Sequence, residues 1–129
     1  MTLAVVGLCR FGSAVDVRRS DAERLDQLIE AFDGVDTVVN ATTGPPAGIT
    51  RSTRAIHDAC LRAGVTRLIH LSSATVYGDV AQPFPDDAPP LDKHWMPYAR
   101  AKGAAEVWLR SQLGRSPLDI VVLRPGIVW

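Results

Sequence analysis

Short apolar runs that alternate with helix-like segments are the feature that most constrains how this chain folds. Valine, isoleucine and leucine dominate these runs, which cover residues 3–8, 35–41, 67–72 and 119–123. Nearly continuous apolar strands are typical of sheets buried on both faces, and strand–helix alternation is typical of parallel sheets. The sequence therefore predicts a three-layer α/β fold, in which a parallel sheet carries helices on both faces.

Helical signals separate the runs. Ser20-Asp-Ala-Glu23 has the spacing of a capping box, and the apolar positions after it share one helical face as far as Asp33-Gly34. A second helix is expected over residues 47–62, closed by Gly64. A third is expected from Pro97 to about Leu113, because proline suits the first helical turn.

Composition narrows the class of protein. The chain has 129 residues, enough for one domain, and 47% of them are apolar, enough for a core. Fourteen acidic and fourteen basic residues balance, which argues against a nucleic-acid partner. Cys9 and Cys60 lack metal-ligand spacing, and the apolar start is too short to cross a membrane. We expect a cytoplasmic protein with no metal and no membrane or nucleic-acid partner.

Polar residues follow three of the apolar runs. They are Asn40-Ala41-Thr42, Ser72-Ser73 and Arg124-Pro125. In open parallel sheets, ligands bind beyond the carboxyl ends of the strands. We therefore expect these three groups to line one cleft.

Tyr98 and Lys102 are one helical turn apart, so they share a face of the third helix. A phenol is a poor acid or base near neutral pH, but a nearby ammonium stabilises the phenolate. At ~4 Å and an effective dielectric near 20, this attraction is roughly 4 kcal/mol before desolvation. Ser73 can supply a hydroxyl that holds a substrate oxygen. The three residues form a candidate proton-transfer group, although the tyrosine–lysine pair alone also occurs by chance, with the lysine solvated.

Several segments together resemble the extended short-chain dehydrogenase/reductase superfamily, in its branch of NAD-dependent epimerases and dehydratases of the UDP-galactose 4-epimerase type. The resemblance runs from about Val15 to Trp129 and is carried by Asp16-Val17, residues 38–41, Thr53, Leu71-Ser-Ser-Ala-Thr-Val-Tyr-Gly78, Tyr98-Ala-Arg-Ala-Lys102 and Leu123-Arg-Pro-Gly126. It implies a partial Rossmann fold that binds NAD or NADP.

The resemblance also implies roles for individual residues. The catalytic residues would be Ser73, Tyr98 and Lys102. The substrate would contact Ser73, Ala74, Thr75 and Tyr98. The cofactor would contact Arg10, Asp16, Val17, Asn40, Ala41, Thr42, Lys102 and Pro125.

Some of these assignments have alternatives. Arg10 stands where NAD-specific relatives carry an acid, which favours NADP slightly because arginine pairs well with phosphate, but a solvated arginine is an equal alternative. Asp16 contacts adenine or is a turn residue. Arg124 faces a substrate phosphate or closes its strand. His70 is expected in the core and His94 in a surface loop.

The chain lacks one element of the pattern. No Gly-x-x-Gly-x-x-Gly turn is present, and Gly7 and Gly12 do not have its spacing. We therefore expect residues 1–129 to be a partial NAD(P)-binding domain without the glycine-rich first βα unit and the C-terminal substrate lobe. The alternative is a divergent complete protein that binds no dinucleotide.

The sequence thus favours an NAD(P)-dependent epimerase, dehydratase or reductase that acts on a hydroxyl/keto substrate, a nucleotide sugar by resemblance. Ile49 departs from the family pattern, which has an asparagine here that serves the proton relay. This departure favours the alternative, a non-catalytic nucleotide-binding or regulatory module or an inactive fragment. Relatives often dimerise through the helix that bears the tyrosine, so a homodimer is a further expectation.

Overall fold

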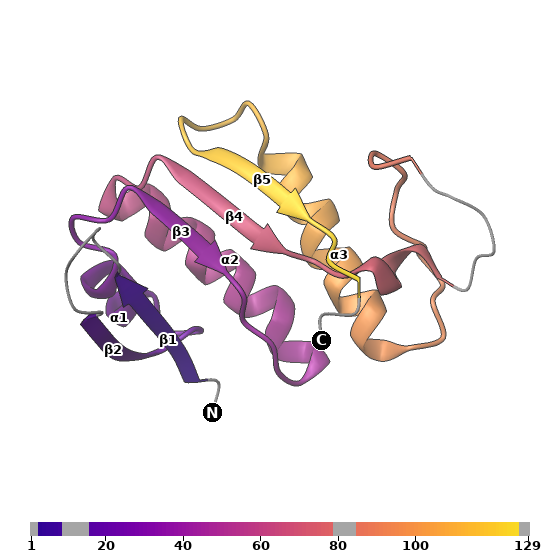
Figure 1. Cartoon of the computed structure of the whole chain (residues 1–129), viewed down its shortest axis with the longest axis horizontal. Helices are drawn as coiled ribbons and strands as arrows, with labels where there is room; N and C mark the ends of the chain where they lie inside the picture. The colour runs from indigo at the N-terminus through magenta and orange to yellow at the C-terminus, as the bar shows by residue number, and fades with distance from the viewer. Residues whose placement is uncertain (1–2, 9–15, 79–84, 127–129) are drawn as a thin grey trace.

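The computed structural model describes residues 3–8, 16–78 and 85–126, with side chains from Ser20 onward (Figure 1). The elements follow in the order β1 (Leu3–Leu8), β2 (Asp16–Asp21), α1 (Leu25–Ala31), β3 (Thr37–Asn40), α2 (Pro46–Ala63), β4 (Arg67–Leu71), the short 3₁₀ helix η1 (Ala74–Tyr77), α3 (Pro97–Gln112) and β5 (Asp119–Leu123).

The parallel sheet that the sequence predicts is formed by β3, β4 and β5, in that order. β4 pairs with both neighbours, so Asn40 lies opposite His70, and Leu71 lies opposite Leu123. β1 instead pairs with β2 in a separate antiparallel sheet. Residues 9–15 are too few to form the crossover that a parallel pair of strands requires.

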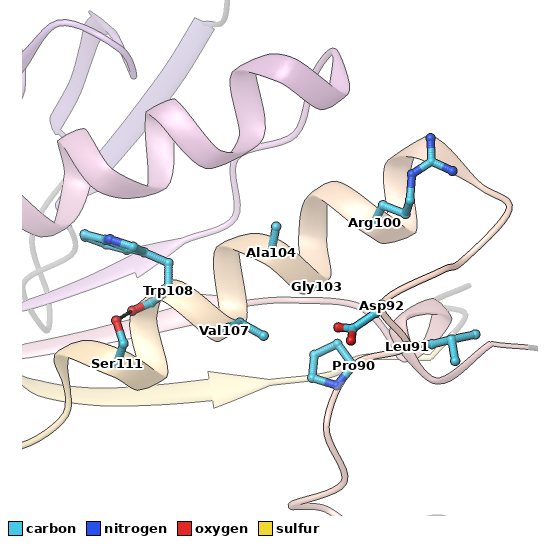
Figure 2. Close-up of a pocket in the computed structure, with 9 residues that line it drawn as sticks. All are labelled: Pro90, Leu91, Asp92, Arg100, Gly103, Ala104, Val107, Trp108 and Ser111. Atoms are coloured by element: carbon cyan, nitrogen blue, oxygen red, sulfur yellow. Dashed lines mark hydrogen bonds between the residues drawn. The ribbon is translucent and has the colours of Figure 1, made fainter.

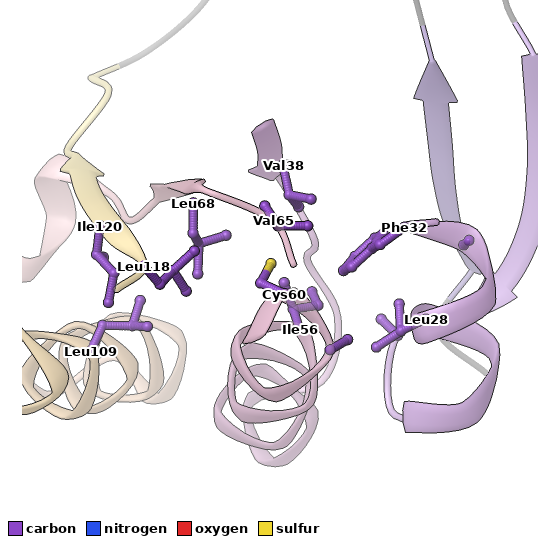
Figure 3. Packing of buried hydrophobic residues seen from close by; sticks show 13 residues of the cluster. Leu28, Phe32, Val38, Ile56, Cys60, Val65, Leu68, Leu109, Leu118 and Ile120 are labelled. Carbon is purple, nitrogen blue, oxygen red and sulfur yellow. The ribbon is translucent and has the colours of Figure 1, made fainter. Parts of the chain in front are cut away.

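Helices α2 and α3 pack against each other and cover one face of the parallel sheet (Figures 1 and 3). The strands alternate accordingly, since Val38 and Leu68 are buried, whereas Val39 is 58% and Leu123 is 47% exposed. The α/β class with a parallel sheet and helices is confirmed. The sequence also predicts helices on the second face of the sheet, but within residues 3–8, 16–78 and 85–126 no helix covers that face (Figure 1).

The core lies between this covered face and the helices (Figure 3). Its largest side chains are Leu28, Phe32, Ile56, Leu68, Leu109 and Ile120. Cys60 is fully buried among them. Burial of each large apolar side chain contributes roughly 1.5–3 kcal/mol to folding before entropy is counted. This packing places Leu109 of α3 against Leu118 and Ile120 at β5 (Figure 3).

The start of α1 differs from the prediction. Ser20 belongs to β2 and is buried, and the N-cap is Arg24, which makes no side-chain cap bond. Glu23 instead forms an ion pair with Arg51 of α2, with Nε 2.9 Å from Oε2. The capping box is therefore wrong, because β2 continues through the serine. The helix ends as predicted, before Gly34, whose φ is +71°.

The other two helices begin and end close to their predicted bounds. Pro46 lies in the first turn of α2, and Gly64 closes this helix in the left-handed conformation. Pro97 begins α3. Within the described part of the chain, no helix is both long and apolar enough to cross a membrane.

Candidate functional site

The carboxyl ends of the three parallel strands bring together segments that are far apart in the sequence. Ser72 N donates to Leu123 O at 2.8 Å, which continues the pairing of β4 with β5. Ala74 N donates to Pro125 O at 2.9 Å. Pro125, predicted to contact the cofactor, thus lies beside Ala74, predicted to contact the substrate.

Lys102 reaches this edge from α3. Its side chain is buried, with the residue 3% exposed, and Nζ donates to Leu71 O at 2.9 Å and to Thr42 O at 3.3 Å. The ammonium therefore connects the ends of β3 and β4. Burial lowers the pKa of Lys102. The alternative interpretation, a solvated surface lysine, is wrong.

Tyr98 lies one turn before Lys102 on α3 and is half-buried. The ammonium of Lys102 is 5.9 Å from the centroid of the Tyr98 ring. The two side chains share a face, as the spacing predicts. A cation at this position stabilises negative charge on the ring and its oxygen.

Ser73 is the N-cap of η1, a short helix that was not predicted from the sequence. Its Oγ accepts hydrogen bonds from Thr75 N at 3.2 Å and from Thr75 Oγ1 at 2.8 Å. A serine hydroxyl has two acceptor positions and one hydrogen to donate. Thr75 uses both acceptor positions, and no described residue accepts the hydrogen of Ser73, which suits donation to a ligand oxygen. α3 packs against η1 and so brings Ser73 toward the helix that carries Tyr98.

Asn40 ends β3 and is buried. Its Oδ1 accepts from Thr42 N at 3.1 Å and from Thr42 Oγ1 at 2.7 Å, and its Nδ2 is 3.0 Å from His70 Nδ1. The side chain of Asn40 therefore shapes the strand end. Contact between residues 40–42 and a cofactor stays a prediction, for which Ala41 is exposed and Thr42 is half-buried.

His70 lies in β4 and is 1% exposed, so the prediction of a core histidine is confirmed. Burial, followed by the charge of Lys102, lowers the pKa of His70 to about 4. The ring is therefore neutral at physiological pH. Through Asn40 it supports the loop whose Thr42 carbonyl holds the ammonium of Lys102.

A buried ion pair between Glu106 of α3 and Arg124 lies next to this site and was not predicted. Glu106, one turn after Lys102, is completely buried, and Arg124 Nε donates to its two carboxylate oxygens at 3.2 and 3.0 Å. Arg110 Nη2 lies 3.0 Å from Oε1. Burial alone would raise the pKa of Glu106, but hydrogen bonds and charges, led by Arg124, lower it. Glu106 follows Lys102 by one helical turn, so the two share a face of α3, and this spacing is the sequence signal that points to Glu106.

The structure describes the remaining predicted residues only in part. Asp16 and Val17 begin β2, in the separate two-stranded sheet, and their side chains lie outside the described residues. Arg10 also lies outside the described residues. His94, expected on the surface, is 4% exposed, and its Nδ1 accepts a hydrogen bond from Met96 N at 3.0 Å. This bond folds the loop back on itself and explains why the histidine is buried.

A cavity of about 450 Å³ lies along α3 between this helix and the preceding loop (Figure 2). Its lining includes Pro90, Asp92, Arg100, Gly103, Val107 and Trp108. None of the predicted catalytic, substrate or cofactor residues lines this cavity. It is therefore separate from the strand-end site.

The sequence profile of a family described as NAD(P)H-binding matches residues 10–128. The chain belongs to this family. The match covers each strand-end segment described above.

Proteins of known activity show the same relationship. The chain is 26% identical over 113 residues to a dTDP-glucose 4,6-dehydratase of Streptomyces niveus, a match that covers 81% of this chain and 33% of that protein. The solved structure of a UDP-N-acetylglucosamine 4-epimerase from Bacillus cereus is 25% identical, with a TM-score of 0.68 over 83% of this chain and 39% of that one. This chain thus spans about a third of these relatives.

A dTDP-glucose 4,6-dehydratase from Streptomyces venezuelae, solved with NAD bound, has a TM-score of 0.69. The match covers 81% of this chain and 36% of that one, at 24% identity. At this identity the comparison supports the fold. This chain thus has the Rossmann-like fold of that structure, as the sequence predicts.

The strand-end site suits the cofactor of this family. An ammonium has three hydrogens to donate, and Leu71 and Thr42 accept two of those on Lys102. Among the described residues no third acceptor is present, so one hydrogen is left for a ribose hydroxyl. Ala41 is small and exposed, which lets a ligand approach the strand end.

Proposed function

We propose that this chain forms the nicotinamide-binding and proton-transfer part of an NAD(P)-dependent epimerase, dehydratase or reductase. The observation that carries the proposal is the position of the Lys102 ammonium. It is held by Leu71 O and Thr42 O at the ends of two parallel strands, one helical turn from Tyr98. A buried cation with one unused hydrogen beside a phenol suits proton transfer.

Each of three side chains has a separate task. Tyr98 takes the proton of the substrate hydroxyl, and the positive charge of Lys102 beside it favours this transfer. Ser73 donates its free hydrogen to the reacting oxygen and orients it. When bound, the nicotinamide supplies the hydride acceptor. Lys102 would hold the cofactor through its third hydrogen.

The proposed substrate is a nucleotide sugar. Support comes from the names of the relatives, a dTDP-glucose dehydratase and a UDP-N-acetylglucosamine epimerase. Ala74 and Thr75 lie in η1 beside Ser73, where a hydroxyl/keto group would meet them.

The cofactor is proposed to be NAD or NADP, with a slight preference for NADP. Arg10 supports this preference, because a guanidinium binds a 2′-phosphate well. The solved relative from Streptomyces venezuelae holds NAD, which argues for the other choice. Titration with NADH and NADPH in parallel decides between them.

A non-catalytic nucleotide-binding module is the second candidate. Ile49 favours it, because this residue is apolar and 3% exposed where the resemblance calls for an amide that serves proton relay. Such a module would bind the dinucleotide and leave a nucleotide sugar unchanged. A homodimer is proposed through α3 and its C-terminal end, since Val107 in the helix is 51% exposed and the C-cap residue Leu113 is 52% exposed.

The test is a pair of measurements on the chain. Enhanced NADH or NADPH fluorescence measures binding, and NMR of dTDP-glucose, UDP-glucose and UDP-N-acetylglucosamine incubated with NAD or NADP measures conversion. Binding with conversion supports the enzyme. Binding without conversion supports the module, and no binding of either dinucleotide contradicts both proposals.

A further inference from the structure

Residues 85–96, which we call the strap, precede α3 in the chain and contact both η1 and α3. Leu91 N donates to Val76 O at 2.8 Å, which attaches the strap to η1. Arg100 Nη1 donates to His94 O at 2.8 Å, which attaches it to α3. The strap also lies close to α3 at Gly103, where an added Cβ would be 3.0 Å from Pro90.

The guanidinium of Arg124 contacts the strap, η1 and α3. Nη2 donates to Ala88 O at 2.7 Å, and Nη1 donates to Asp86 O at 3.4 Å, both in the strap. The guanidinium carbon is 4.5 Å from the centroid of the Tyr77 ring in η1. Nε and Nη2 also bond to Glu106 of α3. The side chain is 7% exposed, so these contacts are shielded from water.

These bonds occupy all three guanidinium nitrogens. Of the two roles considered for Arg124, these contacts support one within the chain rather than binding of a substrate phosphate. The other role, in which Arg124 only closes β5, is incomplete, because the partners of Arg124 belong to η1, the strap and α3.

We propose that Arg124 is a positioning residue that holds the strap and η1, and with η1 Ser73, at a fixed place relative to Tyr98 and Lys102 on α3. The significance of this placement for turnover rests on the proposed function. The placement itself does not, since it can be measured without cofactor or substrate.

Arginine suits this role because its planar guanidinium offers five hydrogens in a rigid fork. A lysine at this position can pair with Glu106 but cannot bond to two strap carbonyls and stack on Tyr77 at the same time. The carboxylate of Glu106 makes the arrangement possible, since a buried guanidinium without an anion would be strongly destabilising.

The test compares amide hydrogen exchange in Arg124→Lys with the wild type. The reporters are the amides of Ala74, next to Ser73, and of Leu91 in the strap, which donate to Pro125 O and Val76 O. Val65, whose amide donates to Cys60 O at the other end of the sheet, is the reference. Because bonds from a charged donor are lost, we expect both reporters to exchange at least about tenfold faster, with Val65 unchanged.

Arg110→Ala is the matched control, because Arg110 also pairs with Glu106 but makes no bond to the strap. It should leave both reporter amides at their wild-type rates. If Arg124→Lys does not fold, the double variant Arg124→Met with Glu106→Gln avoids an unpaired buried charge and should show the same faster exchange. Unchanged exchange at Ala74 and Leu91 in a folded variant overturns the proposal.

A second measurement separates positioning from general stability. Where the wild type turns over, Arg124→Lys should lower kcat about tenfold or more while the NADH dissociation constant stays within about twofold. An unchanged kcat overturns the positioning role. If the wild type binds no dinucleotide, the proposed function fails, while the exchange rates still decide whether Arg124 holds the strap.

Discussion

Nζ of Lys102 donates to the carbonyl oxygen of Leu71 at 2.9 Å, so a buried cation from α3 is attached to the end of β4. This carbonyl belongs to the last residue of the strand, after which the chain continues to Ser73. The bond therefore fixes where α3 lies relative to the carboxyl ends of the strands. Tyr98, one turn earlier on the same helix, is positioned by the same contact.

Replacement of Lys102 by methionine should weaken both stability and cofactor binding. The carbonyls of Leu71 and Thr42 lose their donor, which costs about 1–3 kcal/mol of unfolding free energy. We expect at least about tenfold weaker NADH binding, because a hydrogen bond from a charged group is lost. Urea unfolding and NADH fluorescence measure the two effects. Lys93→Met, at an exposed lysine, is the control and should change neither.

Replacement of Tyr98 by phenylalanine should separate binding from chemistry. The ring stays beside Lys102, so NADH should bind with nearly the wild-type dissociation constant. Turnover of a nucleotide sugar should fall by about a hundredfold or more, because the proton acceptor is gone. Activity close to that of the wild type would reject the role of Tyr98.

His70 should make the protein less stable in mild acid. Its pKa is about 4 in the folded chain, against an ordinary value of 6.5, so the unfolded chain binds a proton that the folded chain does not. The stabilisation is complete above pH 6.5 and is lost as the pH falls from 6.5 toward 4. The loss is up to about 3 kcal/mol, measurable by urea unfolding across this range.

His70→Asn is the control for this pH dependence, because asparagine can still accept a hydrogen bond from Asn40 but does not titrate. The difference in unfolding free energy between pH 6.5 and 4 should be smaller in the variant. Identical pH profiles of the two proteins would show that His70 is not buried in its neutral form.

Cys60 should be unreactive in the folded protein. It is completely buried, and burial raises the pKa of its thiol to about 12. Iodoacetamide should therefore modify Cys60 only when the chain unfolds. Mass spectrometry of the peptide that contains Cys60, with and without urea, measures this. Rapid modification without urea would contradict the packing of α2 against the sheet.

Local patterns predicted the elements that depend on neighbouring residues. The bounds of β5 and the end of α2 at Gly64 follow from apolar runs and turn residues close in sequence. The tyrosine–lysine pair was recognisable for the same reason, since helical spacing alone places both side chains on one face.

Features that depend on distant residues were missed. The pairing of Glu106 with Arg124 arises only when the end of β5 lies beside α3, and the helical spacing that marks Glu106 does not identify its partner. The capping box failed because the pairing of β2 with β1 extends over Ser20. Burial of His94 depends on the fold of the strap. Tertiary contacts override local preference in each case.

Mapping of NAD onto the chain by NMR chemical-shift changes tests the central claim most directly. The account predicts that amide shifts cluster at residues 40–42, at Ser73–Thr75, and at Tyr98 and Lys102. Shifts confined to the cavity beside Val107 and Trp108, with the strand ends unchanged, would contradict it.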